Sequence, residues 1–255
     1  TAIKKYPYHS KAEDPCATVT IYTPEFPSVT LSGTSQMSVS GGAFSGDNLS
    51  VTLSGVAKID GLSGTWNRAN ITMSGTARMN NLTLKSGACY LTCSGVAEIA
   101  GVSSISSDKV QLSMSGATSI KIDNINSGLV DATASGAGKL SSLEVNASEL
   151  IANLSGASAV KFTGKIGKIS AEMQGASSLS LHGNGNEVTV SAFGTSTLNA
   201  KNFTVKDASL KLSGVAGATV TVTEKLETET SGSSHIDYYG NPKTVNNKSN
   251  NVVRH

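Results

Sequence analysis

Cys89 and Cys93 are the residues whose type and spacing first suggest chemistry, because paired thiolates bind zinc or exchange disulfides. They stand four positions apart in a segment that alternates apolar and polar residues. Four residues of extended strand span about 13 Å, which is too far for a disulfide or a shared metal ion. We therefore expect both side chains to fill an apolar core.

The histidines and aspartates show no ligand or catalytic spacing. The four histidines are far apart in the sequence: His9, His182, His235 and His255. The aspartates do not recur at one position of the repeat, and several adjoin Asn or Gly, as turn residues do: Asp47, Asp60, Asp108, Asp123, Asp131 and Asp207. We expect no catalytic residue, no cofactor site and no metal site, and leave a weak calcium site open.

Trp66 and Tyr90 are the candidates for a surface contact. They are the large aromatic residues with a polar group inside the repeated part of the chain. An exposed aromatic ring beside amides such as Asn70 and Gln111 can stack on a sugar. The alternative is an isolated strand residue without a ligand. Arg78 and Glu98 occupy equivalent positions of successive repeats and are expected to form an exposed ion pair of about 0–1 kcal/mol.

A Ser-Gly pair after an apolar residue returns about every twenty residues. Its glycines are Gly33, Gly55, Gly75, Gly95, Gly116, Gly136, Gly156, Gly175, Gly194, Gly214 and Gly232. Residues two, four and six places before each glycine are nearly all apolar, and those between them are mostly polar. This alternation predicts a strand buried on one side. A second short strand is expected after the glycine, and a third around Leu62, Leu82, Val102 and Leu143.

Twenty extended residues give roughly 66 Å of path, which is one circuit of a narrow coil. Stacking such coils at about 4.8 Å pairs each strand with its equivalent in the next coil. The sequence therefore predicts an all-β fold, a right-handed parallel β-helix of about eleven coils, on the order of 50 Å long.

The prolines predict where this solenoid begins and ends. Pro7, Pro15, Pro24 and Pro27 precede the repeats, Pro242 follows them, and none lies between. Because proline cannot donate to a strand ladder, we expect an N-terminal flank and cap over 1–27, the β-helix over 28–240 and a C-terminal tail over 241–255. The end of that tail, residues 246–255, is expected to fray.

Composition excludes several classes of protein. The net charge is +2 among 255 residues, so electrostatics favours neither nucleic acid nor an anionic membrane surface. No apolar run approaches the roughly 18 residues of a transmembrane segment. Three cysteines fit no disulfide framework.

The repeated unit resembles the GIN-domain family of Gram-negative bacteria, described as "putative auto-transporter adhesin, head GIN domain". The segment Phe26-Pro-Ser-Val-Thr-Leu-Ser-Gly and the tail from Ser231 to Lys243 carry the resemblance most strongly, although Gln174 and Phe193 stand where serine is usual. The resemblance implies a right-handed β-helix in an exported protein of the periplasm, outer membrane or cell surface, often a lipoprotein. It implies no known activity and no functional residues.

Three functions follow as hypotheses. The first is a non-enzymatic, exported β-solenoid for adhesion or cell-envelope interaction, with a glycan or a surface protein as ligand. The second is a carbohydrate-active enzyme on the same fold. The third is a structural spacer whose end coils stack into a homo-oligomer.

Overall fold

The computed structural model describes residues 20–23, 25–26, 28–248 and 251–255. Within these residues there is no helix, and therefore none that could cross a membrane. The strands are β1 (Ser28–Leu31), β2 (Gln36–Ser38), β3 (Phe44–Leu53), β4 (Lys58–Asp60), β5 (Ser63–Met73), β6 (Arg78–Cys93), β7 (Glu98–Met114), β8 (Ser119–Ala134), β9 (Lys139–Leu154), β10 (Ala159–Met173), β11 (Ser178–Ala192), β12 (Thr197–Leu212), β13 (Gly217–Thr230), β14 (His235–Tyr239), β15 (Thr244–Asn247) and β16 (Val252–Arg254).

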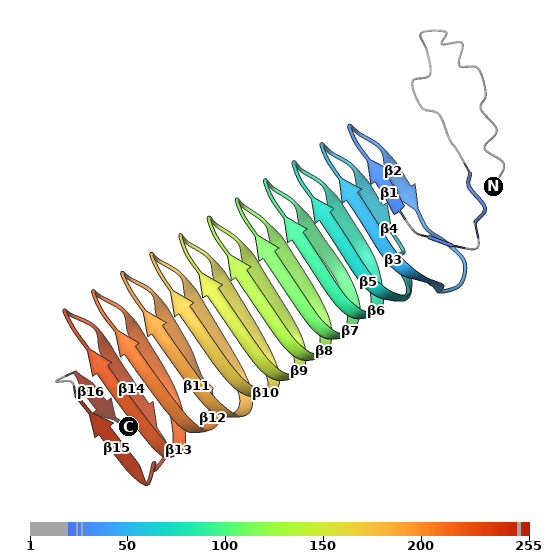
Figure 1. Ribbon diagram of the computed structural model, residues 1–255. Coiled ribbons are helices and arrows are strands. Elements are labelled where there is room, and N and C mark those ends of the chain that lie inside the picture. The colour runs from blue at the N-terminus through green and yellow to red at the C-terminus, as the bar shows by residue number, and fades with distance from the viewer. Residues whose placement is uncertain (1–19, 24, 27, 249–250) are drawn as a thin grey trace.

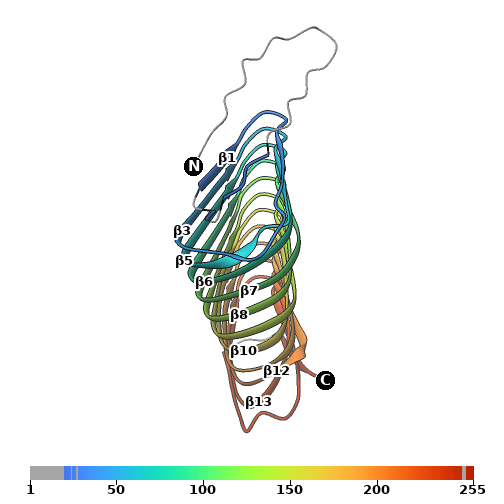
Figure 2. The ribbon, with the colours of Figure 1, turned by 90° about the vertical axis from the view of Figure 1, so that its right-hand side faces the viewer.

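These strands form one parallel sheet that winds into stacked coils. Each strand pairs with its equivalent in the next coil, as β6 does with β7 from Arg78↔Glu98 to Cys93↔Met114. Figure 1 shows the coils side by side along a rod, and Figure 2 shows them as a flattened ring seen closer to the rod axis. The expected parallel β-helix of about eleven coils, with about 20 residues per coil, is confirmed.

Each coil contains three runs of alternating buried and exposed residues, separated by corners. In one coil these runs are Ala57–Ile59, Leu62–Trp66 and Ala69–Met73, whose end residues are all buried. The third run leads into the glycine turn, and we call it the approach segment. The outer surface of the stacked approach segments is called the approach face. The inner sides of all three runs form one continuous apolar core.

The glycine turn recurs because a side chain there would collide with the previous coil. Gly75 has φ +74°, and a Cβ on it would lie 2.7 Å from the carbonyl oxygen of Gly55. The next amide, that of Thr76, donates a 2.7 Å hydrogen bond to the same oxygen. Only glycine combines this left-handed backbone with so close an approach, so the ladder runs unbroken through the turn.

The third run departs from expectation at one residue. Leu62, Leu82 and Val102 are buried as predicted, but Leu143 is 58% exposed. The ladder pairs Ile122 with Ser142, which is buried, so Leu143 lies one place further on, at the corner. A shift of one residue reverses the side to which a strand side chain points.

The two ends of the rod differ. The flank 1–27 lies largely outside the described residues, but Phe26 is buried and its ring centroid is 5.3 Å from that of Phe44. The prediction that residues 246–255 fray is wrong for the part that the structure describes. β15 extends the ladder on β13, and β16 pairs with β14 and covers Ile236.

Candidate functional site

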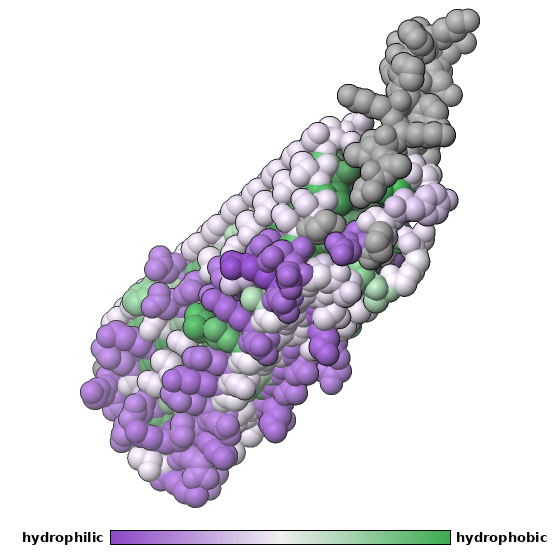
Figure 3. Space-filling model, turned by 45° about the vertical axis from the view of Figure 1, so that its right-hand side comes forward, coloured by the Kyte–Doolittle hydropathy of each residue, from purple (hydrophilic) through white to green (hydrophobic). Residues whose placement is uncertain are grey.

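The approach face carries two outward columns of side chains, five and three places before each glycine. In the first coils the second column is a row of hydroxyls: Thr30, Thr52, Thr72, Thr92, Ser113 and Thr133. In the last coils it becomes charged, with Glu172, Lys211 and Glu229. On the side that Figure 3 shows, hydrophilic side chains gather over the C-terminal half of the rod, whereas much of the N-terminal half is close to neutral in hydropathy.

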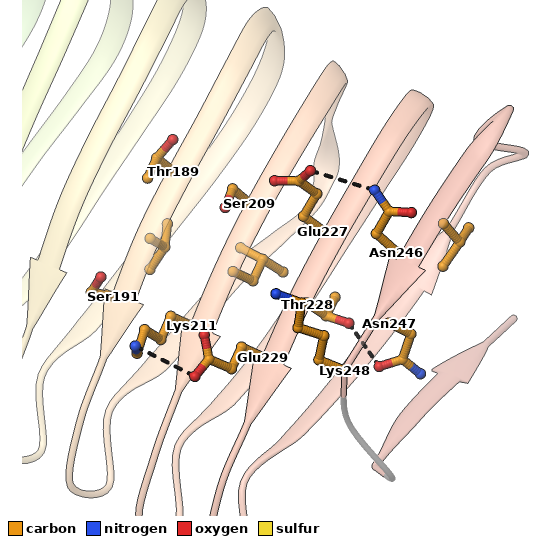
Figure 4. A pocket seen from close by; sticks show the side chains of 13 residues that line it. Thr189, Ser191, Ser209, Lys211, Glu227, Thr228, Glu229, Asn246, Asn247 and Lys248 are labelled. Atoms are coloured by element: carbon orange, nitrogen blue, oxygen red, sulfur yellow. Dashed lines mark hydrogen bonds and ion pairs between the residues drawn. The ribbon is translucent and has the colours of Figure 1, made fainter.

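A groove of about 730 Å³ lies between these two columns at the C-terminal end. One wall is formed by Thr189, Ser209, Glu227 and Asn246, and the other by Ser191, Lys211, Glu229 and Lys248, from β11, β12, β13 and the β15 segment. Figure 4 shows the two rows with the backbone between them. The groove therefore runs across successive coils, along the rod axis.

Ion pairs hold the charged residues of the groove. Lys211 Nζ lies 3.4 Å from Glu229 Oε1, and Lys225 Nζ lies 2.7 Å from Glu227 Oε1. The hydrogen bond and the charge of Glu227 raise the pKa of Lys225, and the same contact from Lys225 lowers the pKa of Glu227. The Nδ2 of Asn246 also donates to Glu227, at 3.5 Å. Both charge signs are thus fixed beside a row of hydroxyls.

The core behind the groove becomes polar at the end of the rod. Thr228 occupies an inward position that Val190 and Leu210 hold in the preceding coils. Its hydroxyl donates a 2.9 Å hydrogen bond to Asn247 Oδ1. This bond gives the last coil a polar end without an uncompensated buried hydroxyl.

A second, smaller hollow of about 430 Å³ follows a corner in the N-terminal half. Its rim includes Lys85, Asp108 and Asn126. Ser107 and Ser127 lie beneath it and donate 2.8 Å hydrogen bonds to the carbonyl oxygens of Lys109 and Leu129. Because these hydroxyls already bond to the backbone at the corner, we take the larger groove as the candidate site.

Trp66 is not a surface residue, so its predicted role as a surface contact is wrong. The side chain is 2% exposed and points into the core. The indole fits because Gly64 lacks a side chain: a Cβ there would collide with Cη2 of the ring, whereas a Cβ on Gly46 would make an ordinary contact of 3.4 Å with Cδ1. Gly64, two residues before Trp66 in the same strand, was the sequence signal that could have placed this ring inside.

Tyr90 lies on the approach face, between Asn70 and Gln111 in neighbouring coils, as expected. Its ring is partly buried, and the guanidinium carbon of Arg68 stands 4.7 Å from the ring centroid. One face of the ring is therefore covered by a cation. The structure places Tyr90 several coils away from the groove, so the two aromatic candidates and the groove do not form one site.

The other residues considered in the sequence analysis contribute to the fold. Cys89 and Cys93 are free, buried thiols, and burial raises the pKa of each to about 12. Arg78 Nε lies 3.3 Å from Glu98 Oε2 in an exposed pair, as predicted. Asp60 accepts a hydrogen bond from Asn81 of the next coil. Among the described residues, no group of three or more His, Cys, Asp or Glu side chains could hold a metal ion.

Sequence analysis did not identify the groove. A signal was present in the column three places before glycine, where threonine gives way to Glu172, Lys211 and Glu229. The closure of the groove by Asn246 and Lys248 had no such signal, because these residues follow the last repeat and were expected to fray.

Comparison with known proteins gives one match. The model of the family described as "Putative auto-transporter adhesin, head GIN domain" matches residues 141–242. No curated protein and no solved structure matches the chain. The matched stretch includes the groove residues on β11, β12 and β13. The resemblance to the GIN-domain family is thereby confirmed for the part of the chain between residues 141 and 242.

Proposed function

We propose that the protein is an exported β-solenoid that adheres to a glycan or a similar hydroxyl-rich surface polymer and does not change it chemically. The observation that carries this proposal is the groove along the rod axis, with Thr189, Ser191 and Ser209 near Lys211 and Glu229. Hydroxyl and charged groups at regular spacing can donate and accept hydrogen bonds along an extended polymer. The family description, which names an auto-transporter adhesin, supports export and adhesion.

The charge distribution of the groove supports binding rather than hydrolysis. Its carboxylates lie in ion pairs or accept hydrogen bonds, as Glu229 does with Lys211 and Glu227 does with Lys225. Glycoside hydrolysis requires one carboxyl group that stays protonated near neutral pH. The contacts of Glu227 lower its pKa, which works against that role.

The test is binding of the purified full chain to an array of neutral, amino-sugar and uronic-acid oligosaccharides. Ser191→Arg places a long side chain in the groove wall and is expected to weaken binding at least about tenfold. Thr92→Arg is the matched control, because Thr92 holds the same column on the opposite half of the rod. Equal binding by both variants would place the contact elsewhere.

The same purified protein also tests the other two hypotheses, the carbohydrate-active enzyme and the structural spacer. Release of new reducing ends from any bound oligosaccharide, with and without calcium, would replace the adhesion proposal by a carbohydrate-active enzyme. An array without any bound saccharide, together with growing oligomers in light scattering as concentration rises, would favour the spacer.

A further inference from the structure

The repeat breaks at two adjacent coils. In nine of the eleven coils the residue before the turn glycine is serine, but Gln174 and Phe193 hold that position in the coils of Gly175 and Gly194. The ladder pairs Met173 with Ala192, so Gln174 and Phe193 are the next residues in the same register. Two such residues in neighbouring coils stand about 4.8 Å apart.

The backbone ladder does not require these two side chains. Where serine is present, its hydroxyl often donates to a carbonyl of the previous coil, as Ser135 does to Met114 at 3.2 Å. The amides of Gln174 and Phe193 keep the ladder bonds to Leu154 and Met173, at 2.9 and 2.8 Å. The ladder at both positions is therefore the same as in the coils that carry serine, so coil stacking does not account for these residues.

Both residues lie beside the groove. Phe193 follows the groove-wall residue Ser191 by two positions along an extended chain, which is roughly 7 Å. Figure 4 shows Ser191 and Thr189 at the β11 end of the groove. Phe193 is 38% exposed, Gln174 is exposed, and Val215 of the next coil is 61% exposed on the other side of the turn. An aromatic ring and an amide thus adjoin the end of the polar groove.

The position of Phe193 is well fixed. Its carbonyl oxygen accepts a 2.9 Å hydrogen bond from the buried hydroxyl of Ser196. The following Gly194 has φ +76°, and a Cβ there would lie 2.9 Å from the carbonyl oxygen of Gly175. A ring held on such a backbone loses little conformational entropy when it binds a ligand.

We propose that Phe193 and Gln174 form a sugar-ring subsite at the β11 end of the groove. The C–H face of a pyranose packs on the aromatic ring, and the amide of Gln174 donates to and accepts from the ring hydroxyls. The rest of the saccharide continues along the groove past Ser191 and Lys211. This subsite deepens the proposed adhesion function and rests on it.

The test replaces each of the two exceptional residues by serine. Phe193→Ser and Gln174→Ser introduce the residue that the other coils carry, so both variants are expected to melt at or above the temperature of the unaltered chain. The control is Val96→Ser, which removes an even more exposed apolar residue from the turn five coils away. Binding is measured by isothermal titration with cellohexaose, chitohexaose and hexagalacturonate, a neutral, an amino-sugar and an acidic probe.

We expect Phe193→Ser to weaken binding of at least one hexasaccharide about tenfold or more, which corresponds to about 1.4 kcal/mol. Phe193→Tyr should retain binding, and Val96→Ser should leave it unchanged. If the unaltered chain binds a hexasaccharide and both serine variants bind it equally well, the subsite is refuted while the adhesion function stands. If the unaltered chain binds none of the three, the subsite falls, and the array decides the broader proposal separately.

Discussion

Gly116 faces the carbonyl oxygen of Gly95 in the preceding coil so closely that a Cβ on Gly116 would lie 2.5 Å from it. The backbone of Gly116 is also left-handed, with φ +80°. We expect Gly116→Ala to destabilise the protein by about 3 kcal/mol or more, because a left-handed alanine and a backbone collision add. Urea denaturation followed by circular dichroism measures the loss.

Gly33 provides the matched control for that substitution. It has φ +65°, but a Cβ there meets nothing within 4 Å. Gly33→Ala should therefore cost only the left-handed backbone, about 1–2 kcal/mol. Equal losses for the two variants would show that contact between coils is not what excludes side chains from the turn.

Cys89 and Cys93 should not react with thiol reagents in the folded protein. Both are buried, and at pH 8 a pKa of about 12 leaves them protonated and therefore poorly nucleophilic. The measurement is labelling at pH 8 in a Cys16→Ser background, because Cys16 lies outside the described residues. Both thiols should be labelled only after denaturation, and rapid labelling of the native chain would contradict their place in the core.

The same thiols predict a pH dependence of stability. Their folded pKa of about 12 lies above the ordinary thiol value of 9.0, so the unfolded chain binds fewer protons between these values. Their contribution is complete below pH 9 and is lost as the pH rises toward 12. Compared with a Cys89→Ala, Cys93→Ala chain, the free energy of unfolding should fall more steeply in this interval. Parallel curves would contradict the shift.

Truncation of Trp66 should cost much more stability than truncation of Tyr90. Trp66→Ala removes a buried indole and is expected to cost about 3–5 kcal/mol. Tyr90→Ala removes a partly exposed ring covered by Arg68 and should cost about 1 kcal/mol or less. Thermal unfolding compares the two, and resistance of Trp66 fluorescence to iodide provides a second check. Ready quenching in the native state would contradict its burial.

The last strand should protect its amides from hydrogen exchange. β16 pairs with β14 from Ile236↔Val252 to Tyr238↔Arg254, and His255 Nε2 lies 3.1 Å from Asp237 Oδ1. The amide of His255, which donates a 3.0 Å hydrogen bond to the carbonyl oxygen of Tyr238, should exchange more slowly than the amides of the exposed segment 20–22. Exchange at the same rate in both segments would restore the frayed tail that the sequence suggested.

The repeat made the fold predictable from sequence. Each coil contacts only its neighbours, so the period of about twenty residues and the apolar columns already specify which residues stack. For this reason the sequence alone was enough to place Cys89 and Cys93 in the core and Arg78 beside Glu98. The glycine turns were predictable on the same ground, because one steric requirement recurs in every coil.

Other features of the structure depended on details that the repeated apolar positions do not specify. A shift of one residue at a corner buried Ser142 and exposed Leu143. Trp66 has room for its indole in the core because Gly64, two residues earlier in the same strand, has no side chain. Such outcomes depend on the register and local volume of neighbouring coils, which a periodic pattern does not fix.

The sequence alone therefore determined the β-helix, its core and its steric turn, since each follows from a repeated local pattern. The tertiary structure decided the groove, because its walls combine the irregular last coils with β15, a strand beyond the repeats. It also placed Phe193 and Gln174 beside Ser191, which turned two breaks in a motif into one surface. Contacts at an end of a solenoid have no further coil to repeat them, so only the folded chain reveals them.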